Sequence, residues 1–215
     1  MRNVEFHYRF EPGASPDAPC LLLLHGTGGD EHDLIALGRS MLPEAALLSP
    51  RGRSLEHGMP RFFRRLSQGA FDLDDLVVRA RELSDFVYEA ARVHRLDLAR
   101  TVALGYSNGA HVAAAMMLLR PDTVGGAILF RAMMPYSLYR MPDLTGRRIF
   151  LSAAQRDHLV PPEHAEALAD LFRNTGADVA LDWRPGGHEL DGFDVEAARQ
   201  WLGYTVMLLG AARAR

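Results

Sequence analysis

Lysine is absent from the 215-residue sequence, so all 24 basic residues are arginines. Schiff-base and pyridoxal-phosphate chemistry need a lysine amine, and so does the P-loop that binds nucleotide phosphates. The sequence therefore excludes these lysine-dependent sites. Cysteine is almost absent as well, because Cys20 stands alone and cannot form an internal disulfide. A cytoplasmic protein is the simplest expectation.

Other missing patterns exclude further classes of function. No apolar run approaches the about 20 residues that a membrane span needs, and the first residues lack the apolar stretch of a signal peptide. The net charge of -3 gives no reason to expect a nucleic-acid partner. The histidines form no H-E-x-x-H pair, and no G-x-G-x-x-G follows a predicted strand. We therefore expect neither a metal nor a dinucleotide cofactor.

The patterns that are present alternate between strands and helices. Short apolar runs predict strands at 4–10, 20–25, 46–49, 101–105, 126–130, 148–152 and 179–183. Amphipathic or helix-forming segments predict helices at 33–41, 73–93, 110–119 and 162–172, with a last helix that begins near Asp194. This alternation predicts one α/β domain, 1–215, with a mostly parallel sheet of about seven strands and helices on both faces.

The segment 50–71 fits none of these patterns. No clean period of hydrophobic residues runs through it, so we expect irregular structure there. A long irregular segment in a compact domain is often a lid or binding loop. No other insertion is large enough to be a cap domain, which predicts a shallow and fairly open site.

The pentapeptide Gly105-Tyr106-Ser107-Asn108-Gly109 is the most informative motif. It has the form G-x-S-x-G and lies between a predicted buried strand and a predicted helix. This is the context of a nucleophile elbow, in which a sharp turn exposes the serine hydroxyl above the edge of a sheet. The alternative is an ordinary strand-to-helix turn with a small hydroxyl residue near the helix start.

Two later loops carry the groups that a serine nucleophile needs. A serine hydroxyl requires a base to accept its proton and a third group to orient that base. Asp157 is the one acid in the loop after the strand at 148–152, and His188 lies in the glycine-rich loop after the strand at 179–183. The order Ser107, Asp157, His188 is the chain order of the triad in α/β-hydrolases. Competing acids follow the histidine at positions 189 and 191.

A tetrahedral intermediate also needs hydrogen-bond donors for its negative oxygen. The backbone N–H of Asn108, directly after the serine, is one candidate. The other should come from the loop after the first central strand, 25–30, where we assign it to Thr27. Two histidines near these residues, His25 and His111, are interpreted as structural rather than catalytic.

These features together resemble a known family. The supporting segments are Leu-His-Gly-Thr-Gly-Gly-Asp-Glu at 24–31, Pro-Arg-Gly at 50–52, Gly-Met-Pro-Arg-Phe-Phe-Arg-Arg at 58–65, Gly-Tyr-Ser-Asn-Gly at 105–109, Asp157 with Val160-Pro161, and Gly-Gly-His-Glu at 186–189. From about Cys20 to Leu202 the chain resembles the phospholipase/carboxylesterase family of α/β-hydrolases, which includes the acyl-protein thioesterases, and in particular its small bacterial carboxylesterases. It departs from the family at Ala154, where glycine is common, and at Asn108, where thioesterases carry glutamine.

The resemblance implies an α/β-hydrolase fold without a large cap and a site near 58–65. There Met59, Phe62 and Phe63 could form an apolar wall for an acyl or aryl group, or could simply pack in the core. Leu159 and Val160 follow the acid and are expected to line the same pocket. A local cluster of arginines, at positions 51, 53, 61, 64 and 65, suits either an anionic substrate group or a solvated face with ion pairs.

The leading hypothesis is a serine carboxylesterase that hydrolyses small, fairly hydrophobic esters through an acyl-enzyme. In it Ser107 attacks, His188 transfers the proton, Asp157 orients His188, and Thr27 with Asn108 binds the oxyanion. Two alternatives stay open: a thioesterase or lysophospholipase on the same triad, and a non-catalytic binding protein on a hydrolase scaffold. Relatives often form homodimers, but no clear exposed apolar stripe in the sequence places an interface.

Overall fold

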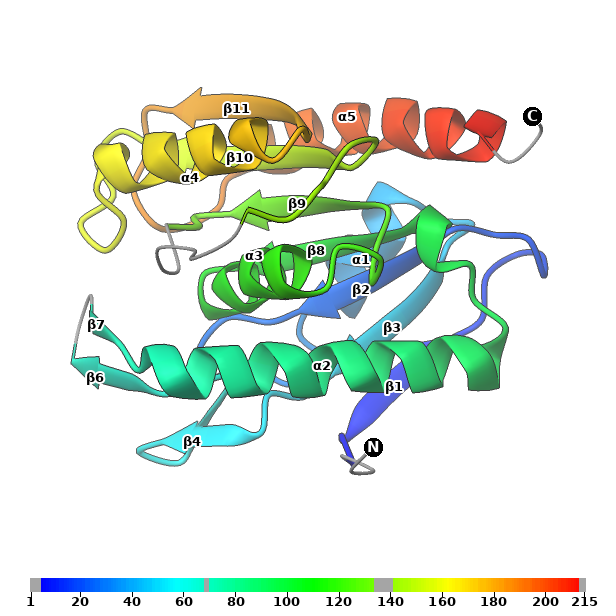
Figure 1. The fold of residues 1–215 in the computed structure, drawn as a ribbon, viewed down its shortest axis with the longest axis horizontal. Helices are drawn as coiled ribbons and strands as arrows, with labels where there is room; N and C mark the ends of the chain where they lie inside the picture. The colour runs from blue at the N-terminus through cyan, green and yellow to red at the C-terminus, as the bar shows by residue number, and fades with distance from the viewer. Residues whose placement is uncertain (1–4, 68–69, 134–140, 213–215) are drawn as a thin grey trace.

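A seven-stranded sheet runs through the computed structural model, which describes residues 5–67, 70–133 and 141–212 (Figure 1). The strand order is β1-β3-β2-β8-β9-β10-β11. The strands are β1 (Tyr8–Glu11), β2 (Cys20–Leu24), β3 (Ala46–Pro50), β8 (Thr101–Tyr106), β9 (Gly126–Phe130), β10 (Arg148–Ala154) and β11 (Asp178–Arg184). All neighbouring pairs are parallel except β1 with β3.

The inner strands are apolar because both of their faces are covered. Every residue of β2, β3 and β9 is buried, as expected of strands in a parallel sheet between two helical layers. The first strand begins at Tyr8, later than predicted, and Val4 of that prediction lies outside the described residues. The predicted α/β-hydrolase architecture is confirmed.

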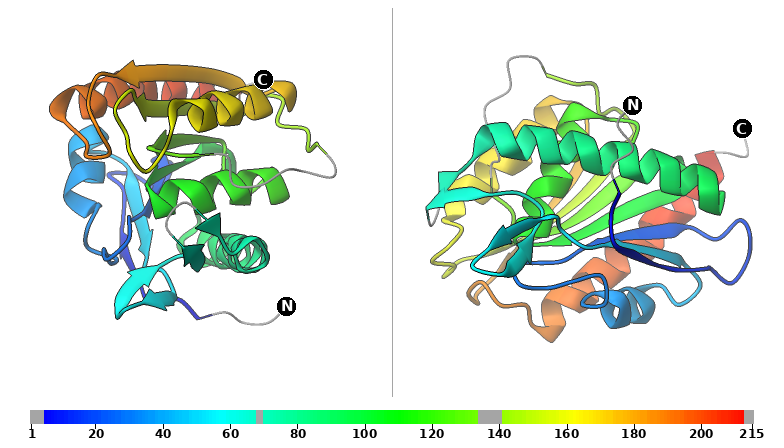
Figure 2. Two further views of the ribbon diagram at one scale, coloured as in Figure 1. Left: turned by 90° about the vertical axis from the view of Figure 1, so that its left-hand side faces the viewer. Right: turned by 90° about the horizontal axis from the view of Figure 1, so that it is seen from below.

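Within the described residues, five α-helices cover the two faces of the sheet. They are α1 (Ile35–Met41), α2 (Leu73–His94), α3 (Asn108–Leu119), α4 (Pro162–Asn174) and α5 (Gly192–Ala212). Helices α2, α3 and α4 lie on one face, whereas α1 and α5 lie on the other (Figures 1 and 2). Each layer has its own hydrophobic core, and α3 is buried along nearly its whole length.

The segment 50–71 is more regular than predicted. It contains two short hairpins, β4 (Ser54–Glu56) with β5 (Met59–Arg61) and β6 (Arg65–Ser67) with β7 (Ala70–Phe71). The prediction of irregular structure is wrong because strands of two or three residues are too short to show alternation. Residues 68 and 69 lie outside the described residues. In Figure 1 the hairpin β6–β7 lies at the end of the sheet to which β9 and β11 point.

Cys20 begins the central strand β2 and is 1% exposed. Burial raises the pKa of its thiol to about 12, so the thiolate does not form near neutral pH. In the part of the chain that the structure describes, no helix combines the length and the apolar character needed to cross a membrane.

Candidate active site

Ser107 lies in the turn between β8 and α3, at the carboxyl end of a central strand. Its φ of 52° and ψ of −116° are unusual for a residue with a side chain, and such strained backbone is found at functional sites. The flanking glycines are required by close packing. A Cβ on Gly105 would lie 2.7 Å from the backbone of Ala110, and one on Gly109 would lie 1.9 Å from the carbonyl oxygen of Leu24. The turn therefore forms only with these two glycines.

His188 and Asp157 come from two other loops and meet Ser107. Nε2 of His188 is 2.9 Å from Oγ of Ser107, and Nδ1 of His188 is 2.8 Å from Oδ2 of Asp157. The second oxygen of Asp157 accepts hydrogen bonds from the backbone N–H groups of Leu159 and Val160, at 2.8 and 3.0 Å. The three residues predicted from the sequence are thus adjacent, in an order that suits proton transfer.

This arrangement also fixes the tautomer of His188. An ionised carboxylate can only accept hydrogen bonds, so Nδ1 must carry the proton. In the neutral ring Nε2 is then an acceptor that faces the hydroxyl of Ser107. The side chain of Asp157 is fully buried while that of His188 is 18% exposed, so the imidazole lies at the boundary between protein and solvent. The Tyr106 hydroxyl donates to the carbonyl oxygen of His188 at 3.3 Å.

Thr27 and Asn108 line the same cavity as Ser107. Asn108 is the first residue of α3, where the backbone N–H groups point out of the helix and the dipole favours negative charge. Its side chain has a separate role, since Oδ1 accepts a hydrogen bond of 2.7 Å from the backbone N–H of Phe62. Thr27 is held through its hydroxyl, which accepts a hydrogen bond of 2.7 Å from Nη1 of Arg61.

The five residues proposed as a substrate wall are divided among three places. Leu159 and Val160 line the cavity beside Ser107. Phe62 and Phe63 are 3% and 0% exposed and belong to the hydrophobic core. Met59 is partly exposed on β5 and lies beside the loop of Thr27, within ordinary contact distance of a Cβ built on Gly28.

The cavity beside Ser107 has a volume of about 240 Å³. The described residues that line it are Thr27, Arg61, Arg65, Phe71, Tyr106, Ser107, Asn108, His111, Met133, Leu159, Val160 and His188. Phe71 and Met133 supply apolar wall that the sequence did not indicate. Both come from segments without a clear hydrophobic period, so no sequence signal singled them out.

A model of the phospholipase/carboxylesterase family matches residues 7–206. The chain belongs to this family. The family is one of α/β-hydrolases, so the resemblance seen in the sequence is confirmed. Among the described residues, no three His, Cys, Asp or Glu side chains are grouped so that they could hold a metal ion.

Individual members of the phospholipase/carboxylesterase family are similar over nearly the whole chain. MhqD of Bacillus subtilis (strain 168), which carries the general name of hydrolase, is 48% identical over 192 residues, which are 89% of this chain and 95% of MhqD. The Bacillus cereus carboxylesterase is 40% identical with a TM-score of 0.91, covering 94% of this chain and 96% of that one. YahD, whose structure was determined with malic acid, is 35% identical with a TM-score of 0.88, covering 94% of this chain and 100% of YahD.

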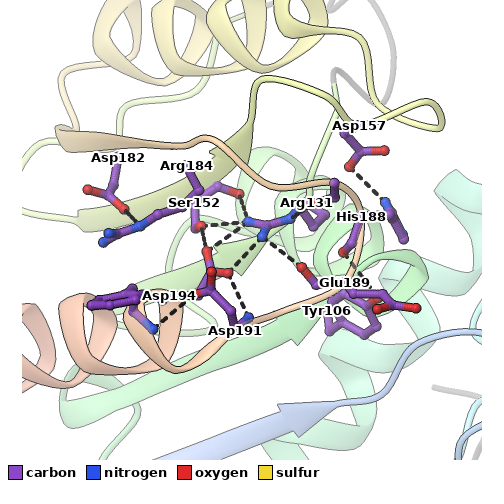
Figure 3. Close-up of polar contacts among 12 residues, drawn as sticks. Tyr106, Arg131, Ser152, Asp157, Asp182, Arg184, His188, Glu189, Asp191 and Asp194 are labelled. Carbon is purple, nitrogen blue, oxygen red and sulfur yellow. Dashed lines mark hydrogen bonds and ion pairs between the residues drawn. The ribbon is translucent and has the colours of Figure 1, made fainter.

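A buried ion pair beneath the His188 loop was not predicted. Arg131 and Asp194 are 1% and 0% exposed, and their side chains meet through two hydrogen bonds of 2.9 and 2.7 Å (Figure 3). Burial raises the pKa of Asp194, but hydrogen bonds from Arg131 and Ser152 outweigh this and hold its pKa below the ordinary value. One feature of the sequence could have indicated this ion pair. Arg131 interrupts the apolar run that includes β9, and arginine is seldom buried without a partner.

The remaining donors of Arg131 reach the loop that carries His188. Nε donates to the carbonyl oxygen of Gly187 and Nη2 to that of Glu189, each at 3.0 Å, while Nη1 also donates to Oγ of Ser152 at 2.8 Å (Figure 3). These two carbonyls belong to the residues on either side of His188. All five N–H groups of the guanidinium therefore have an acceptor. The ion pair fixes the backbone around His188 from below.

Two other histidines have structural environments. His25 is 1% exposed; its Nε2 accepts from the backbone N–H of Gly52 at 2.9 Å, which ties the segment 50–71 to the sheet. Burial lowers the pKa of His25. His111 lies against Phe71, and burial, followed by repulsion from His188 and Arg61, lowers its pKa to about 3. Both rings are therefore neutral near pH 7.

Proposed function

We propose that this member of the phospholipase/carboxylesterase family is a serine carboxylesterase that hydrolyses small, fairly hydrophobic esters through an acyl-enzyme. The observation that carries the proposal is the continuous chain of hydrogen bonds from Ser107 Oγ through His188 to Asp157. Membership of the family and similarity to bacterial carboxylesterases support the reaction class. The whole chain would act as one domain, with 50–71 as the binding segment over the site.

In the proposed mechanism, Oγ of Ser107 attacks the ester carbonyl while Nε2 of His188 accepts its proton. Asp157 keeps Nδ1 of His188 protonated and stabilises the imidazolium that forms. The backbone N–H groups of Thr27 and Asn108 would bind the oxyanion. His188 then protonates the leaving alcohol, and a water molecule, deprotonated by the same nitrogen, attacks the acyl group and releases Ser107.

Stopped-flow hydrolysis of p-nitrophenyl acetate, butyrate and octanoate tests this proposal. The wild type should release a burst of p-nitrophenol, and Ser107→Ala should remove the burst and lower kcat on the order of 10⁶-fold. Ser40→Ala is a matched control, because Ser40 is exposed on α1 and does not line the cavity. Thermal unfolding would check that both variants fold. Wild-type turnover by Ser107→Ala would refute the proposal.

The cavity volume predicts the length of the acyl chain that is hydrolysed fastest. About 240 Å³ is small beside the sites that enclose drug-sized ligands, so acetate and butyrate esters should react faster than octanoate. A dominant rate on an acyl-CoA or a lysophospholipid would instead favour the thioesterase or lysophospholipase alternative. Ligand binding without any release of product would favour a binding protein.

A further inference from the structure

The cavity beside Ser107 carries an excess of positive charge. Arg61 and Arg65 both line it, and no aspartate or glutamate is among the described residues that do. Guanidinium groups remain protonated at all relevant pH values. The buried Asp157 is already paired with His188 and does not line the cavity. The charged groups that a substrate would meet at this wall are therefore cationic.

A single carboxylate pairs with both arginines. Glu56 lies 3.2 Å from Nη1 of Arg61 and 2.7 Å from Nη2 of Arg65. Hydrogen bonding from Arg65, followed by attraction to Arg61, holds the pKa of Glu56 below its ordinary value. Glu56 is therefore ionised near pH 7, and the three side chains together carry one net positive charge.

Arg61 is the more unusual of the two, because its side chain is only 4% exposed. Placing a charged group away from water is costly unless counter-charges and acceptors surround it. Its Nε donates to the carbonyl oxygen of Phe63, and Nη1 donates to Thr27. Among the described residues, Nη2 of Arg61 makes no hydrogen bond. Its two N–H groups therefore have no partner among these residues, and Arg61 is part of the cavity wall.

We propose that the preferred substrates are esters that carry a second, anionic group, a carboxylate held by Arg61 and Arg65. The remaining apolar wall, from Phe71, Met133 and Leu159, would contact the carbon chain between the two ends. This inference rests on the proposed esterase function and changes its substrate class from fairly hydrophobic esters to small esters with an apolar chain and one anionic end. A hydrogen bond between a guanidinium and a carboxylate is charge-assisted, so it is shorter and stronger than a bond between neutral groups.

Two matched pairs of esters test the proposal. Monomethyl glutarate and methyl pentanoate differ by a carboxylate on the acyl side. The anion of 4-acetoxybenzoic acid and its methyl ester differ by a carboxylate on the alcohol side. For each pair, kcat/KM of the anionic ester divided by kcat/KM of the neutral ester defines an anion preference. We expect this preference to exceed one in at least one pair and to fall as NaCl is added.

Two variants should shift the anion preference in opposite directions. Arg65→Gln leaves Arg61 and Glu56 as a balanced pair and should lower the preference about tenfold, which corresponds to about 1.4 kcal/mol. Glu56→Gln removes the competing carboxylate and should raise it. Arg64→Gln is the matched control, because Arg64 is largely exposed, pairs with Asp72 at 3.0 Å and does not line the cavity. It should leave the preference unchanged.

The outcomes separate this inference from the proposed function. The inference is overturned if the wild type prefers the neutral ester in both pairs, or if Arg65→Gln shows the same anion preference as Arg64→Gln. In either case Ser107-dependent hydrolysis would still support the esterase proposal. Failure to hydrolyse any ester would instead refute the esterase proposal itself. Because Arg65 is partly exposed, its variant should fold even if Glu56→Gln does not.

Discussion

Removing the guanidinium of Arg131 should affect both stability and catalysis. In Arg131→Met a side chain of similar length and backbone preference replaces the arginine, so the left-handed φ of 56° costs about the same in both proteins. Asp194 would stay fully buried with its charge but without its partner. Breaking a buried ion pair from one side costs about 3–5 kcal/mol, so we expect that loss in the free energy of unfolding.

A double variant separates the two effects. Arg131→Met combined with Asp194→Leu removes both charges, and replacing a buried pair by apolar side chains is often neutral in stability. The double variant should therefore recover most of the free energy of unfolding that Arg131→Met loses. The carbonyls of Gly187 and Glu189 would still lack their donors, so the backbone around His188 would be less firmly held. A base displaced by about 1 Å can lower the rate about 100-fold.

The assay combines urea unfolding with kcat/KM for p-nitrophenyl butyrate, measured where both variants are folded. We expect Arg131→Met to be unstable and slow, and the double variant to be stable but about 100-fold slower than the wild type, mainly in kcat. A stable double variant with wild-type kcat/KM would refute the idea that Arg131 positions His188. The ion pair would then serve stability alone.

Four further variants test separate features. The pKa of His111 is lowered from 6.5 to about 3, so between pH 6.5 and pH 3 the unfolded chain binds more protons than the folded protein. In this range the free energy of unfolding should fall by about 1.4 kcal/mol for each pH unit of acidification. Urea unfolding of His111→Phe should show a smaller fall over the same range. Gly109→Ala would push a Cβ into the carbonyl oxygen of Leu24 and should lower the free energy of unfolding by about 3 kcal/mol. Gly203→Ala places its Cβ in open space on α5 and should raise the free energy of unfolding by about 0.5–1 kcal/mol. Thermal unfolding measures both changes. Asp157→Asn should lower kcat on the order of 10⁴-fold with little change in fold, as steady-state kinetics and circular dichroism would show, because the histidine would lose its tautomer.

The central strands could be predicted because each is a short apolar run bounded by turn residues. The run from Cys20 to Leu24 and the run from Gly126 to Phe130 were placed almost to the residue. The hairpins of 50–71 could not, since their strands have at most three residues and depend on tertiary contacts. The link between Gly52 and His25 is one such contact, and it joins residues far apart in the chain.

The candidate site also contains residues that the sequence predicts and residues that it does not. Motifs and chain order predict Ser107, Asp157 and His188 as site residues, and in the structure these three residues are joined by hydrogen bonds. Their catalytic roles stay a prediction. Arg131 and Asp194 lack such a motif. Their importance depends on which backbone carbonyls lie above them, and that is set by the packing of β9, β10 and α5 rather than by local sequence.

The chemistry of Cys20 makes this protein unusually easy to label at one chosen place. A thiol that is 1% exposed, with a pKa of about 12, reacts very slowly with maleimides, and the sequence has no lysine amine to react with them instead. Leu66 on β6 is 76% exposed and belongs to the hairpin that contributes Arg65 to the cavity. A fluorophore on Leu66→Cys would therefore report, in a single spectroscopic channel, when an ester enters the site and when its products leave.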